Sequence, residues 1–407
     1  MRALEGIRVI DMSHVMAGPM ASFYLATMGA DVIKVERTQG GDVLRYTNNG
    51  KQSTDFVSLN AGKRSIALDI QDPEALQILK DLILSADVFI ENFTPGTLVK
   101  FGLDYEALVK IKPDLVYCSI SGFGQTGKWS KRGGYDAVVQ SLTGLNMTQG
   151  EGADAPPMKI GFPVVDVATG MLAAMSILGA VLQKKVHGKG ERIDASLVQS
   201  ALTLMYPLVN NYLSDKKPVK RMGNRGYSGS PTASVFKCAD GWISLAANTP
   251  PQFRKTADLV GLSRLYNDPE LFDLELFNSP GAGFVISRNY DAVQEAFNQA
   301  FSEWSSYELE EKLNAAGVPA ARVRTVEEFL DLARDNGDFD LPFTELGSDD
   351  HTVLTAGPGF KTSSPPSADR PGTPAIGQDT RRILADLGYD AQAIDALEKR
   401  GAVRGNG

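Results

Sequence analysis

Short apolar strands alternate with amphipathic helices through the first third of the chain, and this alternation constrains the fold more than any other feature. The expected strands occupy residues 8–11, 31–36, 65–69, 87–91 and 114–120, and the expected helices occupy residues 21–29 and 72–85. This pattern is typical of an α/β protein with a doubly wound, mostly parallel sheet. Ligands bind at the carboxyl ends of the strands in such sheets. The loops at those ends are expected at residues 13–19, 37–42, 92–96 and 121–134.

The loop after the first strand argues against a dinucleotide-binding dehydrogenase. Residues Ser13 to Pro19 lack the GxGxxG spacing that lets a backbone approach a pyrophosphate. Glu36 follows the second strand and resembles a ribose-binding acid, but one acid at a strand end is weak evidence. No phosphate-binding Walker A sequence is present either.

The composition changes near residues 214–234, where a basic stretch is followed by glycine and small polar residues. A hairpin is expected at residues 233–246, then helices at 250–262, 290–304 and 306–316, and a returning strand at Val323. We therefore expect three regions: a large Rossmann-like domain in residues 1–210, a smaller α+β domain in 225–330, and a return to the large domain in 331–407. The last region is expected to combine an extended linker (345–376) with two helices (379–387 and 390–400).

Charge and residue usage exclude several classes of function. The formal net charge of −8 and the absence of a basic stripe argue against a nucleic-acid partner. Two cysteines, Cys118 and Cys238, make neither a disulfide framework nor a cysteine-rich metal site. The three histidines lie far apart, without metal-ligand spacing, and His14 is expected to be structural. These features favour a cytoplasmic protein without a metal.

Asp166 is the only ionisable residue in an apolar run from residue 161 to 182. The run is long enough to be mistaken for a membrane span, but Pro163, Asp166 and several glycines favour a buried core helix instead. Asp166 would lie just before or in the first turn, where free N–H groups and the helix dipole favour the ionised carboxylate. From these residues alone it is either a helix cap or a functional carboxylate.

These segments together resemble the class III (CaiB/BaiF-type) acyl-CoA transferases, of which formyl-CoA transferase is a member. The similarity extends over nearly the whole chain. The matching segments are residues 4–11, 14–19, 25–37, 60–69, 91–96, Tyr135 with Asp136, Asp166 with Gly170, 240–243, 374–379 and 401–403.

The resemblance implies a reaction and its catalytic residue. Asp166 falls on the family's nucleophile, which attacks an acyl-CoA thioester to give a mixed anhydride and CoA thiolate. The thiolate then forms an aspartyl-CoA thioester, and an acceptor carboxylate reverses the steps. A carboxylate suits this covalent route because it needs no proton removal before it attacks.

The resemblance also implies supporting and binding residues. Active-site support falls on Met16, Tyr135, Asp136, Gly226 and Gly229, the last two in a loop thought to lie over the site. CoA contacts fall on Val15, Ala17, Arg37, Leu68, Asn92, Phe93, Thr94, Lys100 and Leu197. Candidates for holding a second carboxylate of the acceptor are Arg45, Arg132 and Arg225. The substrates would be a coenzyme A thioester, with succinyl-CoA one possible donor, and a small carboxylic acid, without a permanently bound cofactor.

Alternatives remain at this point. Intramolecular CoA transfer within a dicarboxylate monothioester is not excluded by the sequence. An α-methylacyl-CoA racemase needs a second base, and no histidine lies between His14 and His187. A non-catalytic acyl-CoA-binding protein would not need Asp166 in an intact motif. The family's architecture further implies a homodimer of two interlocked ring-shaped chains and no membrane partner.

Overall fold

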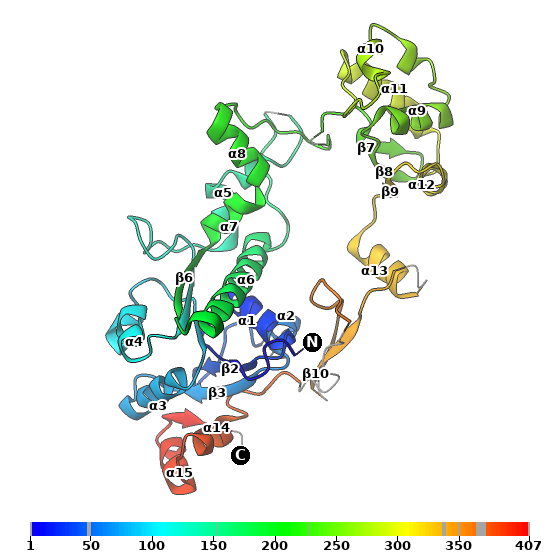
Figure 1. Ribbon diagram of the computed structural model, residues 1–407. Helices are drawn as coiled ribbons and strands as arrows, with labels where there is room; N and C mark the ends of the chain where they lie inside the picture. Colours follow the sequence, from blue (N-terminus) through cyan, green and yellow to red (C-terminus); the bar gives the residue numbers. More distant parts are fainter. Residues whose placement is uncertain are drawn as a thin grey trace. The chain divides into compact units, whose positions relative to one another are not determined.

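The computed structural model describes residues 2–46, 50–152, 154–226, 228–335, 339–348, 351–363 and 372–405. The chain divides into two compact units (Figure 1). The first unit comprises residues 1–146, 159–217 and 341–407, and the second comprises residues 147–158 and 218–340.

The first unit is built on a seven-stranded sheet. Its strands, in spatial order, are β12 (Val403–Arg404), β3 (Arg64–Leu68), β2 (Asp31–Glu36), β1 (Arg8–Asp11), β4 (Val88–Glu91), β5 (Val116–Ser121) and β6 (Glu191–Ser196). All neighbouring pairs are parallel except β12 with β3. The strand order therefore reverses between β1 and β4, the place where sheets of this kind bind ligands.

Helices cover both faces of the sheet because successive strand residues point to opposite sides. Val9 belongs to the core under one helical layer, and Ile10 belongs to the core under the other. One layer contains α1 (Ala17–Thr27), α6 (Val164–His187) and α7 (Leu197–Leu204). The other contains α3 (Pro73–Leu84), α14 (Thr380–Asp386) and α15 (Ala391–Lys399). Shorter elements of this unit are α2 (Thr54–Asn60), η1 (Val99–Phe101), α4 (Tyr105–Ile111), α5 (Asp136–Leu142), η2 (Leu145–Met147) and α8 (Tyr206–Asp215).

The predicted parallel α/β sheet is confirmed, with two differences along it. Helix α1 begins at Ala17, four residues earlier than expected, so part of the predicted loop 13–19 is helical. Gly18 and Pro19 fit its first turn because proline needs no N–H donor there. Strand β6 was not expected, since its sequence is polar and most of its residues are exposed or half-buried at the edge of the sheet.

The expectation of an extended linker over residues 345–376 is partly wrong. β10 (Thr344–Ser348) and β11 (His351–Thr355) form an antiparallel pair that packs on α2. Leu346 and Val353 meet Val57 and Ala61 of α2 in a small apolar cluster. The two predicted C-terminal helices are confirmed as α14 and α15.

The second unit combines a three-stranded antiparallel sheet with helices. The strands are β7 (Ala233–Cys238), β8 (Gly241–Ala246) and β9 (Ala320–Arg322), so the predicted hairpin is confirmed and the returning strand ends just before Val323. The helices are α9 (Pro250–Leu259), η3 (Leu265–Asn267), α10 (Leu274–Phe277), α11 (Tyr290–Ser302), α12 (Ser306–Ala315) and α13 (Val326–Asp335). Edge-to-face phenylalanine contacts, such as Phe253 with Phe297 at 5.5 Å between ring centroids, fill its core.

Among the described residues, α6 has the length and apolar composition that a membrane-spanning helix would need. Its inner face is buried against α1, β5 and β6. A core helix of a folded domain satisfies the same criteria, and this packing accounts for the apolar residues on that face.

Candidate active site at the start of helix α6

Asp166 lies in the first turn of α6, as the sequence predicts, but it does not cap the helix. The cap is provided from another element by Asp136, at the start of α5. One oxygen of the Asp136 carboxylate accepts hydrogen bonds from the backbone N–H groups of Val165 (2.7 Å) and Asp166 (3.1 Å). Two otherwise free N–H groups of the helix are thereby satisfied. The Asp166 side chain is left available for another role.

The surroundings of Asp166 raise the pKa of its carboxyl group to about 6, first because the group is taken out of water and second because Asp136 is negatively charged nearby. The expectation that the helix dipole holds Asp166 ionised is therefore too simple, since burial and a like charge outweigh it. No ion pair to Asp166 occurs in the described part of the chain. The carboxylate is still mostly ionised at neutral pH, and no cation among the described residues pairs with it.

Helices α1 and α6 approach each other most closely one turn after Asp166. A Cβ atom placed on Gly170 would lie 2.6 Å from Met20 Cβ and 2.7 Å from the carbonyl oxygen of Ala17. Only glycine permits this approach, because any side chain would have to push the helices apart. The contact fixes Ala17 and Met16, at the start of α1, with respect to the turn that carries Asp166.

The segment that enters α1 is tied to the end of β4. The Asn92 side chain accepts a hydrogen bond from the backbone N–H of His14 (3.0 Å) and donates one to the backbone carbonyl of the same residue (2.7 Å). The Asn92 amide is thus occupied internally, as a clamp on the His14 backbone. The His14 ring packs near Phe93, with 5.4 Å between ring centroids.

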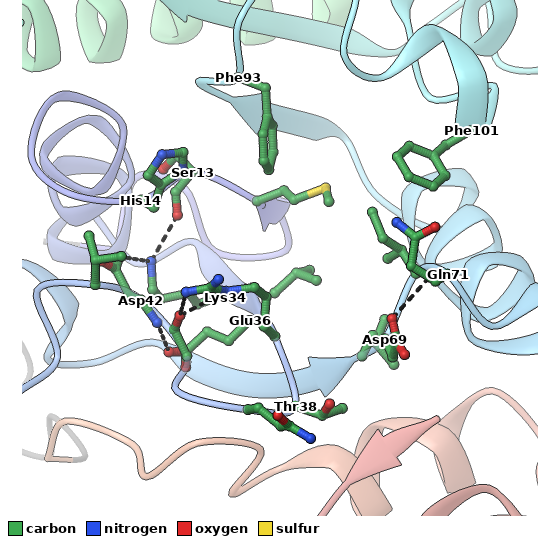
Figure 2. Close-up of a pocket in the computed structure, with 18 of the residues that line it drawn as sticks. Ser13, His14, Lys34, Glu36, Thr38, Asp42, Asp69, Gln71, Phe93 and Phe101 are labelled. Atoms are coloured by element: carbon green, nitrogen blue, oxygen red, sulfur yellow. Dashed lines mark hydrogen bonds and ion pairs between the residues drawn. The ribbon is translucent and has the colours of Figure 1, made fainter. Parts of the chain in front are cut away.

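A pocket of about 860 Å³ opens at the carboxyl ends of β1, β2, β3 and β4, across the point where the strand order reverses. Figure 2 shows the Phe93 ring pointing into it, with His14, Lys34 and Asp42 on one side and Gln71 and Phe101 on the other. Its volume lies in the range of sites for large organic cofactors. Arg37 and Lys100 supply positive charge at its wall.

At the wall of this pocket and close to it, buried acids and bases are paired with one another. The pairs are Lys34 with Asp42 (3.0 Å), Arg45 with Glu36 (2.5 Å) and Lys63 with Asp11 (3.1 Å). Each side chain is at most 1% exposed. Such pairs fix geometry, since removing one partner would strand a buried charge.

The structure changes the interpretation of two of these charged residues. Glu36 does not offer its carboxylate to a ligand, because Arg45, Ser65 and the backbone of Asp42 occupy it. Arg45 is buried, donates to Glu36 and to the carbonyl of Pro374, and packs over the Phe56 ring. It is therefore not free to hold the second carboxylate of an acceptor.

The residues expected to contact CoA fall into several places. Arg37, Leu68, Phe93 and Lys100 line the large pocket. Thr94 lines a smaller cavity of about 200 Å³ that shares Phe93. Val15 lies in the turn before α1, and Ala17 is the first residue of that helix. Leu197 packs in the apolar core of the α6 layer.

The residues expected to support catalysis also lie in different parts of the structure. Met16 precedes α1, and Asp136 caps α6, with Tyr135 beside it and 75% exposed. Gly226 and Gly229 lie in the second unit, where the Gly226 N–H donates to the Ala233 carbonyl. Gly229 has a positive φ of 73°, which favours glycine. Tyr227 of that loop lies outside the described residues.

Several pocket residues were missed from the sequence, and His14 was interpreted as structural. The structure places His14 on the pocket wall with Thr38, Asp69, Gln71 and Phe101. His14, Thr38 and Asp69 follow closely after β1, β2 and β3, so their position at strand ends was a usable signal. Gln71 and Phe101 come from segments whose path could not be inferred from local pattern.

Residues 4–380 match CoA-transferase family III, and the chain belongs to this family. It is an enzyme of the CoA-transferase class.

Relatives agree with this assignment over most of their length. The chain is 33% identical to succinyl-CoA:glutarate CoA-transferase of Mus musculus, over 99% of this chain and 91% of that one. It is 30% identical to formyl-CoA:oxalate CoA-transferase of Streptomyces avermitilis, over 99% and 100%. A CaiB/BaiF family protein from Brucella suis has a similar crystal structure, with a TM-score of 0.77, 31% identity and coverage of 95% and 99%.

Proposed function

We propose that the protein transfers CoA from an acyl-CoA to a free carboxylic acid, with Asp166 as the covalent carrier. One observation carries this proposal most strongly. Asp166 is a partly buried carboxylate at the start of α6, with a raised pKa of about 6 and no ion pair among the described residues. A poorly solvated carboxylate without a counterion is a better nucleophile than one paired with a cation.

The steps follow from the atoms available. An ionised Asp166 oxygen attacks the thioester carbonyl, and the C–S bond breaks to give an aspartyl acyl anhydride and CoA thiolate. The thiolate attacks the Asp166 carbonyl of the anhydride and expels the donor acid as a carboxylate. The acceptor carboxylate attacks the aspartyl-CoA thioester in turn, and the returning thiolate takes the acceptor acyl group. No step needs a proton from the protein.

The large pocket is proposed to hold the nucleotide half of CoA. Arg37 can meet phosphate oxygens through a planar two-point contact, whereas Lys100 offers a single point charge. Phe93 and Phe101 provide apolar surface for the base or the pantetheine arm. The residues proposed to act near the pantetheine arm are Val15, Ala17, Asn92 and Thr94, with Asn92 acting through its clamp on the His14 backbone. Leu197 would support this region from the core.

Asp136, Met16 and Tyr135 are proposed to support the reaction around Asp166. Asp136 holds the first turn of α6 and keeps the pKa of Asp166 raised. Arg132 is the remaining candidate in the first unit for an acceptor's second carboxylate, and its guanidinium packs over the Trp129 ring at 4.0 Å. Gly226 and Gly229 are proposed as active-site support from the family resemblance alone.

Succinyl-CoA is the proposed donor, and a small dicarboxylic acid such as glutarate is the proposed acceptor. The mouse relative carries these substrates in its name, whereas the Streptomyces relative is named for formyl-CoA and oxalate. The apolar Met16, beside the start of α1, favours an acyl group longer than formyl. A panel of acyl-CoA donors against free acids, with products identified by mass spectrometry, tests this assignment. New acyl-CoA species should appear fastest with succinyl-CoA, and their absence from every pair would overturn the proposal.

A homodimer is also proposed. Met171, Met175, Leu182 and Val186 are exposed on one face of α6, opposite its buried face. A connected apolar surface of this kind is typical of an interface between chains. Light scattering of the wild type and of Met175→Glu tests it, since the charge should weaken a dimer that buries this face. Intramolecular transfer would use the same site, and the donor–acceptor panel separates it by showing products without a free acid.

A further inference from the structure

The turn that leads into α1 contains a strained residue. Val15 has a φ of +67°, in the left-handed region that β-branched residues almost never adopt. Such a conformation persists only where the surrounding structure holds it in place, and it occurs most often at functional sites. The contacts that hold Val15 therefore show what the turn depends on.

Asp42 is the side chain that holds Val15. The Val15 N–H lies 3.3 Å from each oxygen of the Asp42 carboxylate. Lys34 reinforces the arrangement, because its ammonium group lies 3.0 Å from Asp42 and donates to the Ser13 carbonyl at 3.0 Å. Asn92 fixes the intervening residue, His14, from the other side.

Asp42 also belongs to the wall of the large pocket, together with Arg37 and Thr38. The loop between them is folded back on itself, since the Arg37 guanidinium donates to the Gly41 carbonyl. The Asp42 N–H donates to Glu36 at the end of β2. A ligand that binds Arg37 or Thr38 therefore contacts the same loop that positions the Asp42 carboxylate.

Beyond Val15 the chain reaches the region of Asp166 within two residues. Met16 precedes α1 and Ala17 begins it, and the Ala17 carbonyl is in the close contact with Gly170 of α6. Asp166 lies one turn before Gly170 on the same helix. The strained turn is therefore the covalent link between the pocket wall and the place where the thioester is proposed to react.

We propose that Asp42 is a positioning residue that couples the nucleotide pocket to the reacting segment through Val15. Binding of the CoA nucleotide orders the loop that carries Asp42, Asp42 holds Val15 in its left-handed conformation, and the start of α1 is thereby fixed beside Asp166. Contacts made far from the reacting atoms then contribute to kcat as well as to KM. This inference rests on the proposed function for the location of the reaction.

Asp42→Asn tests the coupling, because it keeps the size of the side chain and removes its charge. With a full acyl-CoA donor we expect kcat to fall by about tenfold to a hundredfold, the range that follows from a small misplacement of reacting groups. With the matching acyl-pantetheine, which lacks the nucleotide, kcat is expected to change less than about threefold, because remote binding energy is absent from the start. Asp55→Asn, an exposed acid-to-amide change on α2, is the matched control.

A second substitution separates positioning from general destabilisation. Glycine adopts a φ of +67° without strain, so Val15→Gly added to Asp42→Asn should recover most of the lost kcat with acyl-CoA. A merely structural Asp42 would instead lower kcat by the same factor with acyl-CoA and with acyl-pantetheine. Equal losses with both donors, or no recovery in the double variant, would overturn the inference.

Hydrogen exchange of the wild-type protein provides a measurement that needs neither a variant nor turnover. Coenzyme A is expected to slow exchange in residues 37–44 and at the Val15 amide together, whereas pantetheine is expected to slow neither. Protection of residues 37–44 with unchanged exchange at Val15 would also overturn the coupling. Asp166→Ala, assayed in parallel, reports separately on the covalent proposal, because its binding and exchange should stay as in the wild type.

Discussion

Asp11 and Asp166 are both removed from water near the carboxyl edge of the sheet, and they differ in their neighbours. Burial alone would raise the pKa of Asp11, but Lys63 and Lys34, with hydrogen bonds from Ser13 and Ser22, hold it well below its usual range. Burial and then the negative charge of Asp136 together raise the pKa of Asp166 to about 6, so its charged neighbour raises the pKa rather than lowering it.

This difference is the basis for proposing that Asp11 is a structural acid and Asp166 a reactive one. The carboxylate of Asp11 is neutralised and fully hydrogen-bonded, so it fixes the ends of β1 and α1 but has little tendency to attack a substrate. Asp166 is held in place through its backbone by Asp136, and its side chain keeps its charge exposed to the site. In the proposed mechanism, Asp136 supplies the position of the helix turn and Asp166 supplies the reactivity.

The largest expected effect comes from removing Asp166, the proposed nucleophile. Asp166→Ala should lower kcat by about 10³-fold or more, because the covalent route is lost while binding remains. Steady-state CoA transfer and coenzyme A affinity are measured side by side, with Asp55→Asn as control. Near-normal turnover in Asp166→Ala would show that the contrast with Asp11 has no catalytic meaning.

A stability loss is expected where the paired acid is disturbed. Lys63→Met leaves Asp11 buried without its nearest cation, and breaking a buried pair in this way costs about 3–5 kcal/mol. Urea unfolding of this variant is compared with that of Asp11→Leu/Lys63→Met, in which both charges are removed. The double variant should recover part of the loss. A single variant as stable as the wild type would mean that the pair is not holding Asp11 in its charged form.

Glu91, at the end of β4, tests whether burial without a neighbouring cation is enough to raise the pKa of a carboxyl group. Burial first, and then the charge of Asp194, raise the pKa of Glu91 to about 7. Because the folded-state pKa exceeds the usual 4.5, its stabilising contribution is complete below that value and is lost as pH rises through about 7. Glu91→Gln should remove a loss on the order of 2 kcal/mol between pH 5 and 8. The free energy of unfolding is measured for variant and wild type across that range. The same pH dependence in both would contradict the prediction.

The smallest expected effect concerns the second acid beside Asp166. Activity of the wild type should fall below a pH of about 6, as the Asp166 carboxylate gains a proton. Asp136→Asn removes the like charge but keeps an oxygen that can cap α6, so this acid limb should move down by about half a pH unit. The pH profile of kcat/KM measures the shift. An acid limb that moves to higher pH would show that Asp136 does not act by raising the pKa of Asp166.

Much of the sheet could be predicted because its central strands are apolar segments between charged or turn residues. β2 and β4 are examples, since both are almost wholly buried. β6 could not be found in this way, because an edge strand with exposed residues carries no apolar signal. β10 and β11 lie in a segment whose proline and glycine content indicated a linker, and only packing against α2 reveals them as strands.

The site was predictable where a residue stands out locally and unpredictable where it depends on distant partners. Asp166 is conspicuous as the single ionisable residue in the apolar run of residues 161–182. Its cap, Asp136, lies 30 positions earlier along the chain, and Lys63 lies 52 positions from Asp11. Pairings of this length are set by the fold as a whole. The strained backbone of Val15 likewise has no sequence signature, since valine is the residue least expected in that conformation.

Detection of the covalent intermediate tests the central claim most directly. The protein is incubated with a donor such as succinyl-CoA in the absence of acceptor, digested, and examined by mass spectrometry with and without hydroxylamine. We predict a hydroxylamine-sensitive adduct with the mass of CoA on the peptide that contains Asp166, and none in Asp166→Ala. An active enzyme that never forms this adduct, or that carries it on a different residue, would contradict the account.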